Sequence, residues 1–327
     1  MANYQYSADL VNDILFRAGE PTDGTSDFDS IALQYLNRAY QAVYMGGMAL
    51  DSSVNEDWWW LKKSPLPATL ILTPAIVAGT VAVTNNSTDI TFSSGPAADS
   101  DNWFFKVNDH EDIFRISAHT AAGTAATLDS VYTGSTDATA SYKLFKMQYD
   151  LASDVLRVNG PMTVFRDGHR RKYEIDGVEM ESLQRDYPLA RVLSGVPESY
   201  AMVDEDTVQF SRYGGDGSDT TDLIRIEYGY LQRPSVLTDS GAEEPLVPWQ
   251  FRHLLSDIGV FFLFLDKDDN RADGAGLLAK AGIKAMSVEH KKKITDVSRN
   301  FGKIMPRQGR TNRYLRPLRT ESGHIIG

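Results

Sequence analysis

The chain has 327 residues, 42% apolar and 24% charged, which is the ordinary range of globular proteins and suits two domains or one domain with an insertion. It contains no cysteine, which excludes disulfides, thiolate metal sites and thiol nucleophiles. The formal charge is −11, but residues 291–327 hold ten lysines and arginines against two acids, a balance of +8 that leaves −19 for the rest. The body should repel polyanions, and the C-terminal segment should attract them or an acidic protein surface.

Residues 1–66 predict two helices. Apolar side chains at helical spacing follow Ser7 and stop at Gly19, a residue that commonly ends helices. A second amphipathic stretch begins at Ser26, which can cap its first turn, and ends at a glycine pair that starts with Gly46. We expect these helices to form the N-terminal part of a helical core.

A run of three tryptophans, Trp58, Trp59 and Trp60, follows the second predicted helix. In an extended segment, the middle ring would face opposite to the other two. The rings could fill the core of the helical part. Alternatively, they could form a subunit interface, because aromatic residues are enriched at interfaces.

Residues 67–147 form a stretch of different composition that is rich in threonine and alanine. Short alternating runs such as TVAVT, DITF and DIFRI are separated by clusters of Gly, Asn, Ser and Asp. This pattern predicts a small antiparallel β module of five to seven strands. Because helical and mixed patterns resume after it, we expect the module to be an insertion.

Residues 148–298 combine strands with closing helices, which makes the fold class α+β. The runs 207–213 and 222–231 are expected to pair as a hairpin across the glycine-rich loop between them. A strongly apolar helix is predicted over 249–265, and another should run to about Lys293. The predicted inner face of that last helix consists of Leu278, Ala281, Ala285 and Val288.

Residues 299–327 have no periodicity and are expected to be extended. Their arginines recur every third residue, which is the period of a polyproline II helix and would align them on one edge. We predict a docking tail that grips an acidic protein groove, because arginine pairs well with carboxylates and few aromatic residues are present for stacking on nucleic acid bases. The residues assigned to docking are Arg307, Arg310, Arg313, Tyr314, Leu315, Arg316, Arg319, Ile325 and Ile326.

The sequence predicts no catalytic, metal-binding or cofactor-binding residues. A single GGDGSD copy at 214–219 lacks the stacked repeats that bind calcium, and DKDDN at 266–270 lacks the glycine and glutamate of an EF-hand. The six histidines are scattered, without metal-ligand spacing. The longest apolar run, 254–265, is too short and too polar to span a membrane, and the N-terminus has no secretion signal, so we expect a soluble protein.

Three stretches together resemble phage head-to-tail adaptor proteins of the tail tubular protein A type found in short-tailed phages. The first runs from DLVNDILFRAGEPTDGTSD at 9–27 through YLNRAYQAV to EDWWW at 56–60. The second is FRDGHRRKYEID at 165–176, and the third is the long segment 195–259. The chain departs from the family pattern in the GEPT sequence, where a valine is usual after the proline, and in the β module, which minimal adaptors lack.

The resemblance implies a helical bundle combined with an antiparallel β-sandwich. It also implies a homo-oligomeric ring of about twelve copies between the portal protein ring and the tail tube or nozzle protein. Such a ring is a virion structural component of the neck, assembled in the host cytoplasm, and it is not an enzyme. Genomic DNA would pass through its lumen during ejection without sequence-specific binding, and the C-terminal segment would dock on the portal.

An alternative function is a carbohydrate-binding or carbohydrate-hydrolysing tail protein that acts through the β module. Trp103, Phe104 and Phe105 would then stack on sugar rings. The favoured interpretation of this run is that the three side chains belong to a strand whose aromatic rings fill both faces of the sandwich.

Overall fold

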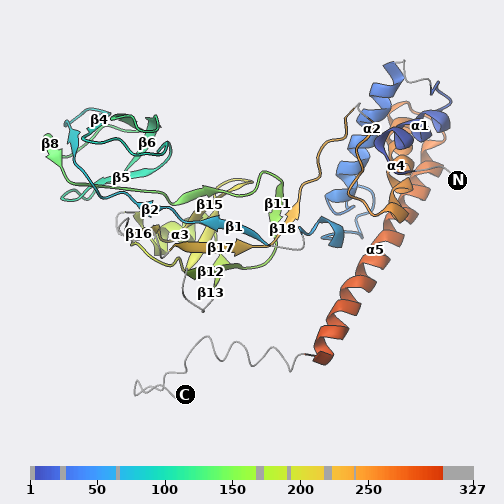
Figure 1. The fold of residues 1–327 in the computed structure, drawn as a ribbon. Helices are drawn as coiled ribbons and strands as arrows, with labels where there is room; N and C mark the ends of the chain where they lie inside the picture. Colours follow the sequence, from blue (N-terminus) through green and yellow to red (C-terminus); the bar gives the residue numbers. More distant parts are fainter. Residues whose placement is uncertain are drawn as a thin grey trace. The chain divides into compact units, whose positions relative to one another are not determined.

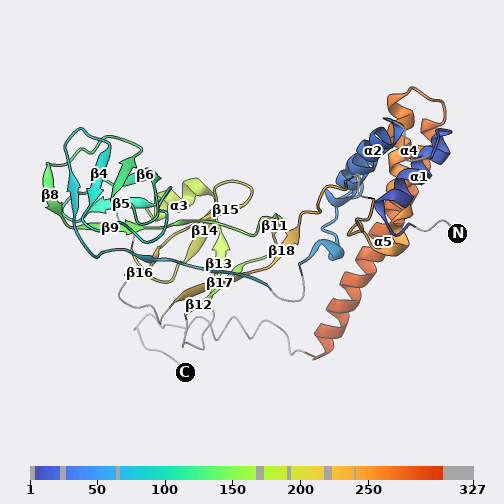
Figure 2. The same ribbon diagram turned by 45° about the horizontal axis from the view of Figure 1, so that its top comes forward.

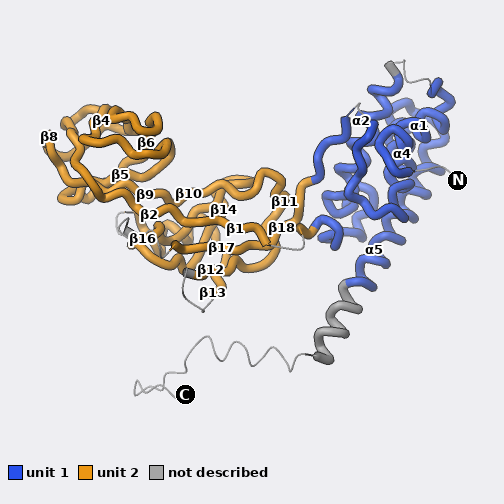
Figure 3. Tube along the Cα trace, viewed as in Figure 1, with its two compact units in different colours: residues 1–61, 234–327 blue, residues 62–233 orange. Residues whose placement is uncertain are grey.

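The computed structural model describes residues 4–22, 27–63, 67–166, 173–189, 193–216, 223–238 and 241–304, with the backbone alone from 294 to 304. The fold is α+β, as the sequence predicts (Figures 1 and 2). The chain forms two compact units (Figure 3). The helical unit combines residues 1–61 with 234–327, and the β unit consists of residues 62–233.

The helical unit is built around its most apolar helix. Its elements are α1 (Ser7–Ala18), α2 (Asp27–Tyr44), the 3-10 turn η1 (Trp59–Leu61), the 3-10 turn η3 (Trp249–Phe251), α4 (His253–Asp266) and α5 (Ala272–Ile304). Helix α4 contacts α1, α2 and α5, and nine of its residues are buried. The predicted N-terminal helices are confirmed, including their ends: Gly19 and Gly46 both adopt the left-handed conformation.

Helix α5 differs from its prediction in two ways. Its buried face consists of Ala279, Ile283 and Met286, whereas the predicted inner residues Leu278, Ala281, Ala285 and Val288 all point outward. On this buried face α5 lies very close to the segment that follows α2. Gly47 permits this approach because it has no side chain: a Cβ there would lie only 2.8 Å from Ile283 Cγ1. The helix also continues to Ile304, past the predicted start of the extended tail at residue 299. A proline at 306 disfavours helix in the residue before it, which explains an end at Ile304.

The larger sheet of the β unit has the strand order β1-β17-β12-β13-β14-β15-β10. Its strands are β1 (Ala68–Ile71), β10 (Gln148–Asp150), β12 (Met162–Arg166), β13 (Tyr173–Gly177), β14 (Ser199–Met202), β15 (Thr207–Phe210) and β17 (Ile224–Tyr228). Four further elements accompany it: β2 (Pro74–Ala75), which pairs with β16 (Gly214–Asp216), and β11 (Val155–Val158), which pairs with β18 (Tyr230–Gln232). The short helix α3 (Met180–Asp186) follows β13.

The predicted hairpin between 207–213 and 222–231 is wrong. Strand β15 pairs with β10 and β14, while β17 pairs with β1 and β12. Strand β17 is buried at Ile224, Ile226 and Tyr228, and it lies between two partners far from it in sequence. Tertiary burial therefore overrides the adjacency in sequence that favoured a hairpin.

The β module has seven strands in the order β8-β3-β4-β7-β6-β5-β9, within the predicted five to seven. They are β3 (Val81–Val83), β4 (Asp89–Phe92), β5 (Phe104–Val107), β6 (Phe114–His119), β7 (Ala125–Leu128), β8 (Asp137–Ala140) and β9 (Tyr142–Phe145). The two outermost strands, β8 and β9, are separated only by Ser141, so the sheet curls back on itself. The module encloses its own core, whose buried members lie between Val81 and Leu144, and it belongs to the same compact unit as the larger sheet.

Candidate interaction surfaces

The predicted docking tail lies outside the described residues. Arg307, Arg310, Arg313, Tyr314, Leu315, Arg316, Arg319, Ile325 and Ile326 all follow Ile304, where α5 ends. The helix that leads into this segment and its contacts up to Lys293 are described. The other predicted interaction site, the tryptophan triplet at 58–60, packs against this helix and is described next.

The three tryptophans do not form the extended segment that their alternation assumed. Trp59 and Trp60 begin the 3-10 turn η1, in which successive side chains point about 120° apart. Trp58 is fully buried and donates its Nε1 hydrogen to the Val43 carbonyl at 2.6 Å, so this ring belongs to the core. Trp59 and Trp60 are only partly buried.

Trp59 lies against α5. Its ring stacks on the imidazole of His290 with centroids 5.8 Å apart, and Lys293 Nζ lies 4.4 Å from the ring centroid. Its backbone N–H donates to His290 Nδ1 at 3.3 Å. Because Nδ1 accepts this bond, a neutral imidazole carries its hydrogen on Nε2, which faces Glu56 Oε2 at 3.5 Å.

Glu56 joins the segment before the tryptophans to α5. Its Oε1 accepts a hydrogen bond from Ser287 Oγ at 2.7 Å and lies 3.0 Å from Lys291 Nζ. Burial acts to raise the pKa of this carboxyl, but the Ser287 hydrogen bond and the neighbouring positive charge outweigh it and hold the pKa below its usual value. Glu56 with Ser287, His290 and Lys291 is called the Glu56 cluster below.

Sequence reasoning missed the Glu56 cluster, although part of its pattern was visible. Ser287, His290 and Lys291 are three and four residues apart, so they share one face of a helix. Polar residues on a face that is otherwise apolar indicate a partner for them. The acidic partner lies more than 200 residues earlier, and nothing in the local sequence identifies it.

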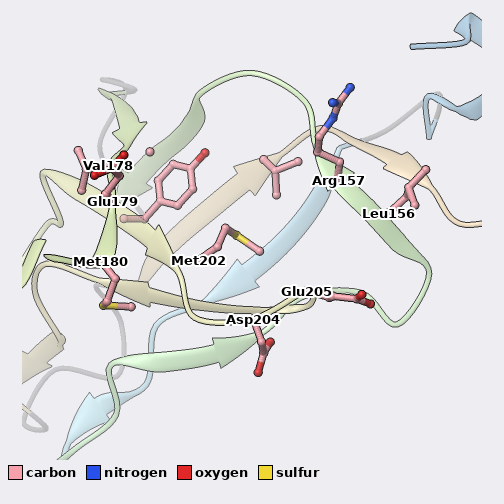
Figure 4. A pocket seen from close by; sticks show the side chains of 11 residues that line it. Leu156, Arg157, Val178, Glu179, Met180, Met202, Asp204 and Glu205 are labelled. Carbon is pink, nitrogen blue, oxygen red and sulfur yellow. The ribbon is translucent and has the colours of Figure 1, made fainter. Parts of the chain in front are cut away.

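The β unit contains a hollow of about 590 Å³ (Figure 4). Its lining comes from β11, from the end of β13 through the start of α3, and from β14 with the turn that follows it. Met180 and Met202 contribute flexible apolar surface, and Glu179, Asp204 and Glu205 contribute carboxylates. Glu205 pairs with Arg233 at 2.6 Å, and Asp204 accepts backbone hydrogen bonds from its own turn. Two of the three carboxylates are therefore engaged locally.

The aromatic run of the β module is internal. Trp103, Phe104 and Phe105 are 5%, 7% and 0% exposed. Trp103 and Phe105 belong to the core of the module, whereas Phe104 lies on the opposite face of the strand and stacks on Phe145 in a separate buried cluster with Met147 and Tyr213. The aromatic rings therefore fill both faces of the strand, which was the second of the two interpretations of this run. They offer no stacking surface to a sugar.

Among the described residues, no group of three or more His, Asp or Glu side chains is arranged to hold a metal ion. No helix in the described part of the chain is both long and apolar enough to cross a membrane. Comparison with protein-family models and with curated proteins found no match.

Proposed function

We propose that this protein is a head-to-tail adaptor, a structural ring of about twelve copies between the portal and the tail tube or nozzle of a virion. The observation that carries the proposal is that the helical unit is built from both ends of the chain. Its N-terminal helices pack with closing helices from the other end of the chain, and the last helix leads directly into the basic segment. The stretches that resemble phage adaptors contain most of α1, all of α2, the first half of α4, most of β13, and strands β14, β15 and β17 of the larger sheet.

The charge distribution supports a role as a DNA conduit. The body carries −19 outside residues 291–327, so a ring of such bodies would let DNA slide through without adhering. In this proposal the protein is assembled in the host cytoplasm and resides in the neck of the virion. Its basic tail docks on acidic grooves of the portal. The burial of Trp103, Phe104 and Phe105 leaves the carbohydrate function without an observation in its favour.

The test is assembly with portal rings of the same virus, followed by sedimentation and electron microscopy. The full chain should convert to a ring-sized species on mixing, and a chain that ends at Ile304 should not. A variant with all five tail arginines from Arg307 to Arg319 changed to Gln keeps the length and removes only the charge, so it should dock weakly. If the shortened chain docks as well as the full chain, the tail mechanism is wrong. If the full chain forms no ring, the adaptor function is wrong.

A further inference from the structure

Helix α5 is apolar on two opposite faces. Ala279, Ile283 and Met286 are buried on one side. On the other side, large apolar side chains are open to solvent, with Leu277 at 70%, Leu278 at 62% and Val288 at 53% exposure. At about 100° per residue, the two faces are centred about 180° apart. Among the elements described, α5 packs on α4 and η1, and its outer face is left uncovered.

The outer face has the spacing of a helix-pairing seam. Leu278, Ala281, Ala285 and Val288 are separated by three, four and three residues, which is the a-d-a-d pattern of two heptads. We call these four residues the outer stripe. The two alanines at its centre allow the backbone of another helix to approach closely. A partner that fits this stripe is therefore a helix.

The charges beside the stripe select the partner and its direction. In this heptad, Lys284 is at position g and Glu289 is at position e, and Lys291 and Asp296 repeat the arrangement one heptad later. A parallel pair of α5 helices places each g lysine beside the e acid of the other helix. An antiparallel pair would instead bring lysine to lysine and acid to acid, which is repulsive.

Lys284 and Lys291, the two lysines at position g, each form an ion pair within their own chain. Lys284 Nζ lies 3.0 Å from Asp51 Oδ2, and Lys291 Nζ lies 3.0 Å from Glu56 Oε1. Their side chains remain 59% and 64% exposed, so each ammonium can also face an acid of another molecule.

We propose that the outer stripe of α5 pairs in parallel with the outer stripe of a second copy of this chain. The pairing does not depend on the adaptor function. The apolar seam covers three helical turns and then meets Lys292 at the next a position, so the contact belongs to the class of small, weak interfaces. The free protein is therefore in equilibrium between monomer and dimer at high concentration.

Sedimentation of the full chain in the absence of portal tests the association. Ala285→Glu places a charge in the seam and should weaken dimerisation at least about tenfold. Lys280→Glu is the matched control, because it changes an exposed residue of the same helix outside the stripe and should leave dimerisation unchanged. A chain that stays monomeric at every concentration overturns the proposal. So does a dimer that Ala285→Glu leaves intact while circular dichroism shows both proteins folded.

The direction of the pair is tested by a charge exchange and by crosslinking. Lys284→Glu should weaken the dimer roughly two- to fivefold, and adding Glu289→Lys should restore it. Because the chain has no cysteine, Ala285→Cys introduces a single thiol that meets its own copy only in a parallel pair. Rapid disulfide formation by Ala285→Cys, but not by Lys280→Cys, is expected. Equal crosslinking of both, or failure of the charge exchange to restore the dimer, overturns the parallel arrangement.

Discussion

Glu56 is a residue whose ionisation connects pH to the packing of α5. Its pKa is lowered in the folded protein, so the unfolded chain binds a proton more readily. Its contribution to the free energy of unfolding is complete above the ordinary glutamate pKa of about 4.3, and it is lost as the pH falls through the lowered folded value.

We therefore expect Glu56→Gln to lower the free energy of unfolding by about 1–2 kcal/mol at pH 7, and by less as the pH falls below about 4. Urea titrations at several pH values measure this difference. Glu111→Gln, at an exposed position in the β module, is the control and should change stability little at either pH. A Glu56→Gln deficit that is the same at every pH would mean that the charge of Glu56 contributes nothing.

The helical unit contains both a core tryptophan, Trp58, and a surface tryptophan, Trp249. Trp58 is 0% exposed and bonded to Val43, and Trp249 is 67% exposed. Trp58→Ala should cost about 3–5 kcal/mol through the cavity and the loss of one of the two hydrogen bonds to the Val43 carbonyl, which keeps the bond from the Gly46 N–H. Trp249→Ala should change stability by less than about 0.5 kcal/mol. Thermal and urea unfolding of both variants check this. Similar losses would contradict the assignment of Trp58 to the core.

At the scale of elements, α4 depends on a glycine where it meets α1. A Cβ on Gly259 would lie 2.6 Å from Ile14 Cδ1, so Gly259→Ala should push these helices apart and cost about 1–3 kcal/mol. Gly274 is also helical, in α5, and a Cβ there would meet nothing within 4 Å. Gly274→Ala should stabilise by up to about 1 kcal/mol, because alanine has the higher helix propensity. Opposite signs in chemical denaturation are the expected result. If both variants were destabilised, the space around each glycine would not determine the sign of the stability change.

The elements also show what the sequence could and could not predict. The period of 3.6 found α1 and α2 because each has one apolar face. Helix α4 was found by its long apolar run, since it packs on three helices and is buried around most of its circumference. In α5 the period fits two faces equally well. The choice between them is made by the fit of Ile283 beside Gly47 and by the Glu56 cluster, which are contacts remote in sequence. The hairpin prediction failed for the same reason, since β17 is placed by β1 and β12.

At the scale of the whole molecule, each unit has its own buried core. The helical unit is made from both ends of the chain, and the β unit is one continuous segment. The core of the β module has its buried members between Val81 and Leu144, all within the β unit. Damage to that core should therefore remain local, because the side chains that lose contacts belong to one unit.

Phe105→Ala tests this division. Phe105 is fully buried in the module, and removing its ring should cost the module about 3–5 kcal/mol. Amide hydrogen exchange should then become faster in strands β3 to β9, while protection in α4 stays at the level of the unmodified protein. Ile283→Ala is the reciprocal variant and should expose α4 and α5 to exchange while sparing the module. If either change lowers protection equally in both units, the two cores unfold as one cooperative body, and the division seen in the contacts has no counterpart in stability.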